Sequence, residues 1–230
     1  MTLIKFIKSK DRIRTFLFLL KINMKNPSLF YKTIILLISF SIGAFNANAY
    51  SFDVDGFSFL SNDGSTAIVQ GVSQYYLYIN SGNIVIPSVV TYENQEYTVN
   101  GISDDAFNRQ SELKSVIIPN TITYLGEDAF YKCTNLTEIS IPNSVKSIGN
   151  AAFLDCTNLN NIAIPNSISF IGREAFSNTA WFDNQPDGLI YAGLVAYNYK
   201  GDMPENTSIT IKDGTLGIAD YAFWISLPTI

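Results

Sequence analysis

The chain repeats itself at intervals of 23 residues. Residues 133–155 read CTNLTEISIPNSVKSIGNAAFLD, and residues 156–178 read CTNLNNIAIPNSISFIGREAFSN, with nothing inserted between them. The same step separates three Ile-Pro-Asn triplets and four Ala-Phe pairs. A fixed period of this size is typical of a solenoid, in which each repeat forms one coil and stacks on the next.

One repeat, residues 136–158, places apolar or small side chains at eight positions. They are Leu136, Ile139, Ile141, Val145, Ile148, Ala152, Phe153 and Cys156. The opening Leu-x-x-Ile-x-Ile alternates as a short strand does, and Pro142 ends it because proline has no N–H for a continuing ladder. Gly149 supplies a turn, and residues 150–153 are expected to form a single helical turn on the opposite side. We therefore predict a β-rich solenoid of about five coils that bury one another's apolar ends.

The repeat consensus resembles a known family. Ile-Pro-Asn-Ser/Thr-Val/Ile-x-x-Ile-Gly-x-x-Ala-Phe-x-x-Cys-x-x-Leu-x-x-Ile is similar to the BspA-type, or Treponema pallidum-type, bacterial leucine-rich repeat. FDVDGFSFLSNDGSTAIVQG at 52–71 is similar to the segment that precedes such repeats in Bacteroides-like surface proteins, and IPSVVTYENQEYTVNGISDDAF to their enlarged first repeat. The resemblance covers about residues 50–223. It implies a leucine-rich-repeat solenoid that adheres to host matrix or to other cells.

The first 49 residues have the layout of a targeting sequence. A basic region begins at Met24, an apolar run extends from Thr33 to Phe45, and Ala47-Asn48-Ala49 has small residues at alternate positions. This layout predicts a secretory signal peptide that starts at Met24 and is cleaved after Ala49, with residues 1–23 as upstream sequence. The apolar run is shorter than the roughly 20 residues that a spanning helix needs. We expect an exported protein without a permanent membrane span, at the cell surface, associated with the outer membrane, or extracellular; a retained anchor is the alternative.

The exported part is expected to have two regions. Residues 50–83 form an N-terminal β cap, and residues 84–230 form the solenoid. The segment TYENQEYT in the first coil and the longer interruption at 181–208 each have the pattern of a β-hairpin. After WISLPTI the repeat stops without a polar capping repeat. This pattern predicts a chain truncated at the C-terminus, or one whose last edge is covered by a partner.

Composition argues against catalysis, cofactors and nucleic acid. The chain has no histidine, the commonest general base and metal ligand. Residues 1–49 hold eight of the 15 basic residues and one of the 20 acidic ones, so the remainder carries seven basic and 19 acidic side chains. This net charge of −12 repels phosphate backbones. We expect no enzyme activity, no cofactor, no metal site and no nucleic-acid partner.

Several short patterns have ordinary structural interpretations. Asp53-Val54-Asp55-Gly56 is similar to the start of a calcium loop but lacks the closing Glu, so a turn is expected. Cys133 and Cys156 occupy one slot in successive coils; we expect buried thiols, with a disulfide as the alternative. We also expect a hydrogen-bonded ladder of three asparagines that recur after the strands, and an aromatic cluster inside the cap. These residues are Asn120, Asn143 and Asn166 for the ladder, and Tyr75, Tyr76 and Tyr78 for the cluster.

One surface remains as the candidate for function. The third and fifth positions of the repeat point outward from the expected strands. In three successive coils these are Ser115 and Ile117, Glu138 and Ser140, and Asn161 and Ala163. Small and polar residues on a repeated face suit binding of a macromolecule by area. We predict binding of an extracellular protein, from host matrix or a bacterial surface; no oligomeric state is indicated. The alternatives are a structural fragment without independent activity and a glycan-binding module.

Overall fold

The computed structural model describes residues 49–203 and 206–223. The expected signal peptide and its start at Met24 lie outside these residues, as does the sequence after Phe223. The chain divides into two compact units, Met1–Tyr50 and Ser51–Ile230. Apart from Tyr50, all the elements below belong to the second unit.

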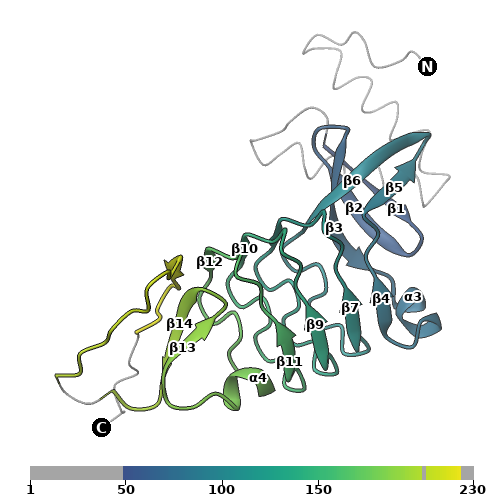
Figure 1. Cartoon of the computed structure of the whole chain (residues 1–230). Helices are drawn as coiled ribbons and strands as arrows, with labels where there is room; N and C mark the ends of the chain where they lie inside the picture. Colours follow the sequence, from purple (N-terminus) through teal and green to yellow (C-terminus); the bar gives the residue numbers. More distant parts are fainter. Residues whose placement is uncertain (1–48, 204–205, 224–230) are drawn as a thin grey trace, which may run out of the picture. The chain divides into compact units, whose positions relative to one another are not determined.

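Four short parallel strands, one from each successive coil, form a four-stranded sheet. They are β4 (Asn83–Val85), β7 (Ser115–Ile117), β9 (Glu138–Ser140) and β11 (Asn161–Ala163), in the order β11-β9-β7-β4 (Figure 1). Pairing from β7 to β11 advances by one repeat, so Ser115 lies beside Glu138 and Glu138 beside Asn161. The repeat period therefore sets the register of this sheet.

The coils also form a second sheet, which we call the long sheet. It contains β1 (Tyr50–Val54), β2 (Phe57–Ser61), β3 (Thr66–Val72), β6 (Gln95–Ile102), β8 (Tyr124–Leu125), β10 (Ser147–Ile148) and β12 (Phe170–Ile171) in that order, with β5 (Val89–Tyr92) paired to β6. Ser147 pairs with Tyr124 on one side and Phe170 on the other. Each regular coil thus contributes one strand to each sheet.

The core lies between the two sheets. All eight inward positions of the repeat at 136–158 are buried. Phe107, Phe130, Phe153 and Phe176 form a continuous column, with ring centroids 5.0, 5.1 and 5.5 Å apart and ring planes within 6° of parallel. Ile118 and Ile141 are buried, while the equivalent residue after the edge strand β11 is only partly covered. These observations confirm the predicted solenoid.

The chain around each Ala-Phe pair differs from the expected helical turn. Ala151 has a φ of +49°, which no α-helix contains. The N–H of Phe153 donates to the carbonyl of Ala175 in the next coil (2.8 Å), whereas Leu154 N–H donates to Ala151 three residues back (3.0 Å). Tight turns therefore alternate with bonds between coils. The N–H groups that a helix would use for its own hydrogen bonds are used here to bond the next coil. The repeat period of the sequence does not show which of these two partners an N–H group takes.

The N-terminal region combines strands with one helix. β2 pairs antiparallel with β3, and β3 pairs in parallel with β6, so the region continues the long sheet. Asp55 and Gly56 form the expected turn between β1 and β2, both with positive φ. Helix α3 (Gln74–Ile79) begins after Ser73, whose hydroxyl accepts a hydrogen bond from the N–H of Tyr76.

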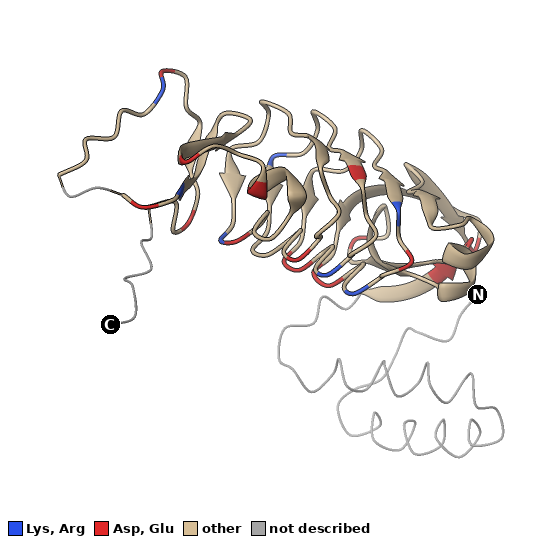
Figure 2. Cartoon of the chain, turned by 90° about the horizontal axis from the view of Figure 1, so that it is seen from below, with Lys and Arg blue, Asp and Glu red and all other residues tan. Residues whose placement is uncertain are grey.

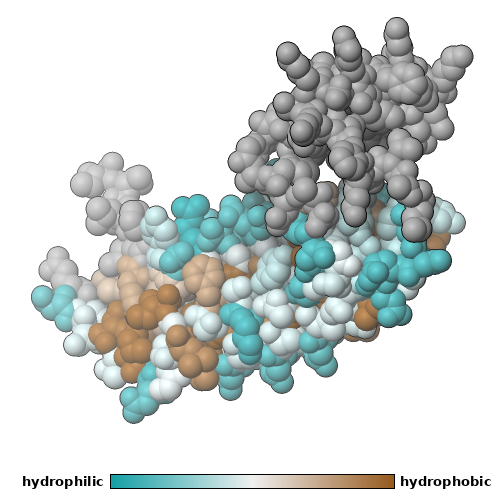
Figure 3. All heavy atoms as spheres, turned by 90° about the horizontal axis from the view of Figure 1, so that it is seen from above, coloured by the Kyte–Doolittle hydropathy of each residue, from teal (hydrophilic) through white to brown (hydrophobic). Residues whose placement is uncertain are grey.

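The C-terminal interruption replaces a coil with other elements. Helix α4 (Ala180–Asp183) is followed by the antiparallel pair β13 (Gly188–Ala192) and β14 (Val195–Lys200), and β15 (Gly217–Ile218) pairs with β14 in parallel. Tyr197 is buried, its ring packs edge-on against Phe176, and its hydroxyl accepts the Phe176 N–H (2.8 Å). At this end Leu216 and Ile218 are exposed, and Figure 3 shows apolar surface gathered here.

Candidate protein-binding face

The structure brings all six predicted site residues onto one side of the four-stranded sheet. Register pairing arranges them in two rows that cross the strands. One row contains Ser115, Glu138 and Asn161, and the other contains Ile117, Ser140 and Ala163. Ser115 is partly buried, and the other five are exposed. We call this surface the strand face.

β4 adds two residues that the sequence reasoning missed. Asn83 pairs with Ser115 and Val85 with Ile117, so each row extends by one strand. The Ser115 hydroxyl donates to the Asn83 carboxamide oxygen (2.8 Å). The signal was present in the sequence, because Ile84 alternates with these two residues as the inward member of the strand. The insertion in the first coil interrupted the 23-residue spacing that would have revealed it.

The strand face changes character along the stack. Val85 and Ile117 are neighbours at its N-terminal end and are 55% and 61% exposed. Toward β11 the same row continues with Ser140 and Ala163, which are smaller. Glu138 is the one charged side chain in the two rows. The face therefore offers an apolar end, a central carboxylate and a shallow polar end.

Helix α3 corrects the prediction that three tyrosines pack inside the cap. Tyr75 is 73% exposed and Tyr78 is 82% exposed. Tyr76 does contact the interior, with its ring centroid 5.1 Å from that of Phe57. Helical spacing explains the split, since Leu77 occupies the inward side of this short helix.

The cysteines are free and buried in the structure. Cys133 Sγ donates to the carbonyl oxygen of Phe107 (3.0 Å), and Cys156 Sγ donates to that of Phe130 (2.9 Å). Hydrogen bonding with Cys133 and burial raise the pKa of the Cys156 thiol. A protonated thiol is a poor nucleophile, which favours a packing role for Cys156.

The asparagine ladder lies at a different repeat position from the one expected. Asn120, Asn143 and Asn166 are exposed, and within the described residues their side chains form no hydrogen bond. The Nδ2 of Asn135 instead donates to Ser111, and that of Asn158 to Thr134, each carbonyl oxygen lying 2.7 Å away in the preceding coil. The prediction of a ladder at these three positions was wrong, because the hydrogen bonds between coils are made by the asparagine that precedes each strand and not by the one that follows it.

The described residues contain few groups suited to chemistry. No cluster of three or more His, Cys, Asp or Glu within them could hold a metal ion. Among the same residues, no helix is both apolar and long enough to cross a membrane. Figure 2 shows acidic residues distributed along the coils, with basic residues at some of the same turns. Among its described residues, the strand face pairs no nucleophile with a base.

A family model described as the BspA type leucine rich repeat region matches residues 74–184, in six copies. None of the curated proteins matches the sequence. These results place the similarity in the region of the coils.

Two solved structures share the fold. A leucine-rich repeat protein from Bacteroides ovatus is 34% identical with a TM-score of 0.52, and the match covers 56% of this chain and 33% of that one. This chain thus spans about a third of that protein. A leucine-rich repeat protein from Bacteroides capillosus is 26% identical with a TM-score of 0.52, covering 57% and 93%.

A more distant likeness is to a structure described as a leucine rich cell surface protein from Faecalibacterium prausnitzii. It is 21% identical with a TM-score of 0.44, and the match covers 76% of this chain and 52% of that one. This likeness is too low to bear on function.

Proposed function

This chain carries a BspA-type leucine-rich repeat region, and from that premise we propose that it is an exported module that binds an extracellular protein through its strand face. The observation that carries the proposal is the pair of outward rows on the four-stranded sheet. Both rows run across consecutive parallel strands, so a partner can contact several coils at once.

The chemistry of the face favours a protein partner. Val85 and Ile117 provide apolar contact area at one end, and Glu138 provides a charge that fixes orientation. Sugar rings commonly stack on exposed aromatic side chains, and the two rows contain no aromatic residue, which favours a protein over a neutral glycan. We further propose that the partner is a protein of host matrix or of another bacterial surface, which the repeat family implies.

The test measures binding of the full chain to immobilised collagen, laminin and fibronectin by biolayer interferometry. A variant with Glu138→Lys, Ser140→Lys and Asn161→Lys places three cations across the face. We expect saturable binding by the native chain and at least about tenfold weaker binding by this variant, since buried like charges oppose docking.

A matched control changes the net charge equally on the other sheet. Thr91→Lys, Gln95→Lys and Glu96→Lys all replace exposed residues of the pair β5 and β6, and none of them lines the hollow of the long sheet. The control should retain native affinity. Equal loss in both variants, or response only to a glycan array, would rule out a protein site on the strand face.

A further inference from the structure

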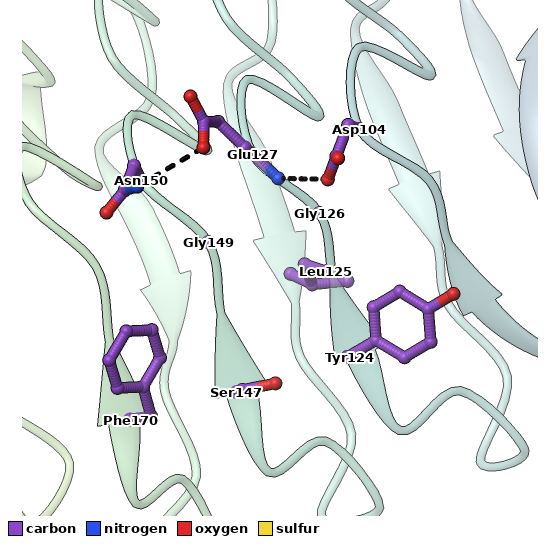
Figure 4. Close-up of a pocket in the computed structure, with 9 residues that line it drawn as sticks. All are labelled: Asp104, Tyr124, Leu125, Gly126, Glu127, Ser147, Gly149, Asn150 and Phe170. Atoms are coloured by element: carbon purple, nitrogen blue, oxygen red, sulfur yellow. Dashed lines mark hydrogen bonds between the residues drawn. The ribbon is translucent and has the colours of Figure 1, made fainter. Parts of the chain in front are cut away.

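The long sheet has a hollow on its outer surface, away from the strand face. Its cavity volume is about 280 Å³. Tyr124 and Phe170 flank it, and Ser147 lies between them on β10 (Figure 4). Beyond the strand ends, Glu127 and Asn150 form its rim together with Asp104.

The hollow exists because one repeat position alternates between aromatic and small residues. The sequence at this position runs Gly101, Tyr124, Ser147, Phe170. The Tyr124 ring lies over Gly101, where a Cβ would overlap it, so the ring leans away from Ser147. Phe170, 47% exposed, provides the opposite wall. A planar or linear group can enter between the two aromatic side chains.

Hydrogen bonds hold the rim in place. Asp104 Oδ1 accepts the N–H of Glu127 (2.8 Å), and Glu127 Oε2 accepts from Asn150 Nδ2 (3.2 Å). Each carboxylate keeps a second oxygen that accepts no hydrogen bond within the described part of the chain. The local potential is negative: burial, then the carboxylates of Asp105, Glu127 and Asp104, raise the pKa of Asp128. Lys146 lies on the same sheet, but its ammonium group points to the Asn143 carbonyl (3.5 Å).

Four other aromatic rings in the described part of the chain have a lysine or arginine of the chain itself over their faces. Lys212 Nζ lies 4.3 Å from the ring centre of Tyr191, and the Arg173 guanidinium lies 5.5 Å from that of Tyr221. Tyr124 and Phe170 have no such cation among the described residues. These two rings therefore lie beside carboxylates, but no lysine or arginine of the described chain lies over them as one does over Tyr191 and Tyr221.

We propose that the hollow binds a basic segment of a partner protein. An arginine or lysine side chain lies across Ser147, with its methylene stem against Phe170 and Tyr124 and its charged group at Glu127 and Asp104. Apolar walls suit the stem, and carboxylates with aromatic rings suit the cation. The site goes beyond the strand face and does not depend on it, because the two lie on different sheets.

The test uses a fluorescein-labelled peptide that alternates arginine with glycine, and fluorescence anisotropy with the full chain. The matched peptide replaces each arginine with citrulline, which has nearly the same shape and no charge. We expect the arginine peptide to bind at least about tenfold more tightly. Binding should weaken several-fold between 50 mM and 300 mM salt, because the contacts are exposed to solvent.

Variants locate the contact. Glu127→Gln and Asp104→Asn keep the rim hydrogen-bond acceptors and remove the charges, and each should weaken binding by about five- to tenfold. Phe170→Ser, which copies Ser147 at the same repeat position, should weaken it by about threefold. Glu112→Gln removes one exposed charge from a loop outside both the hollow and the strand face, and it should leave affinity unchanged.

The contrary outcomes are distinct. Equal binding of the arginine and citrulline peptides would overturn the proposal, as would equal losses in Glu127→Gln and Glu112→Gln. Binding of a neutral glucose or mannose oligosaccharide that is lost in Phe170→Ser, without peptide binding, would assign the hollow to a sugar instead. Failure of the matrix-protein assay, by contrast, concerns only the strand face.

Discussion

The phenylalanine column gives the sharpest prediction about stability. Phe153 is fully buried between Phe130 and Phe176, with centroids 5.1 and 5.5 Å away and planes within 3° of parallel. In Phe153→Ala the neighbouring rings stay fixed by their own coils, so a cavity remains. Truncation of a buried phenylalanine costs about 3–5 kcal/mol, and each lost ring pair adds to the cost of lost burial. We therefore expect a loss of about 4–5 kcal/mol.

Urea unfolding followed by far-ultraviolet circular dichroism measures this loss, and the fluorescence of Trp181, which contacts Phe176, reports on the C-terminal coils. Phe170→Ala is the matched control, because it removes the same side chain from a position that is 47% exposed. That variant should lose no more than about 1 kcal/mol. If both substitutions cost the same, the column does not stabilise the stack and the reasoning fails.

Two further predictions concern buried groups at other sites. Burial raises the pKa of Tyr197 from 10.0 to about 12; the unfolded chain then releases this proton first, so stability is full below pH 10 and falls by about 2–3 kcal/mol as the pH rises to 12. Tyr197→Phe should show a shallower decline in urea stability over that window, and an unchanged slope would contradict the assignment. Gly149→Ala should cost about 1–3 kcal/mol in thermal unfolding, because a Cβ there would lie 2.5 Å from the Glu127 backbone nitrogen. Gly71→Ala, whose nearest atom would be 3.3 Å away, should cost less, and the reverse order would show that coil spacing is not limiting.

Much of the core was predictable from the sequence alone. A strict repeat period shows which residues occupy the same position in successive coils. In a stack of coils, residues at the same position have the same kind of surroundings. Leu136 and Phe153 were therefore assigned to the interior correctly, and the outward rows of the strand face followed from the same count.

The wrong predictions share a cause. Tyr75 and Tyr78 lie outside the repeats, where no period states which side of an element faces inward. Asn120 recurs at the same position of each repeat, yet its side chain forms no hydrogen bond within the described part. A repeat period shows which residues occupy equivalent positions, but it does not show which group each of them bonds. The helical turn at Ala151 fails for a related reason, since its bonding partner lies one coil away.

The sequence by itself determined the repeat length, the inward positions and the strand register between the regular coils, because all three depend only on spacing along the chain. The tertiary structure decided which groups meet across coils: the ring column, the asparagine ladder, and the hollow between Tyr124 and Phe170. Those contacts join residues about one or two repeats apart, and their geometry depends on which way each side chain turns. The spacing of residues along the chain does not specify the direction in which a side chain turns. Packing against the neighbouring coil selects that direction.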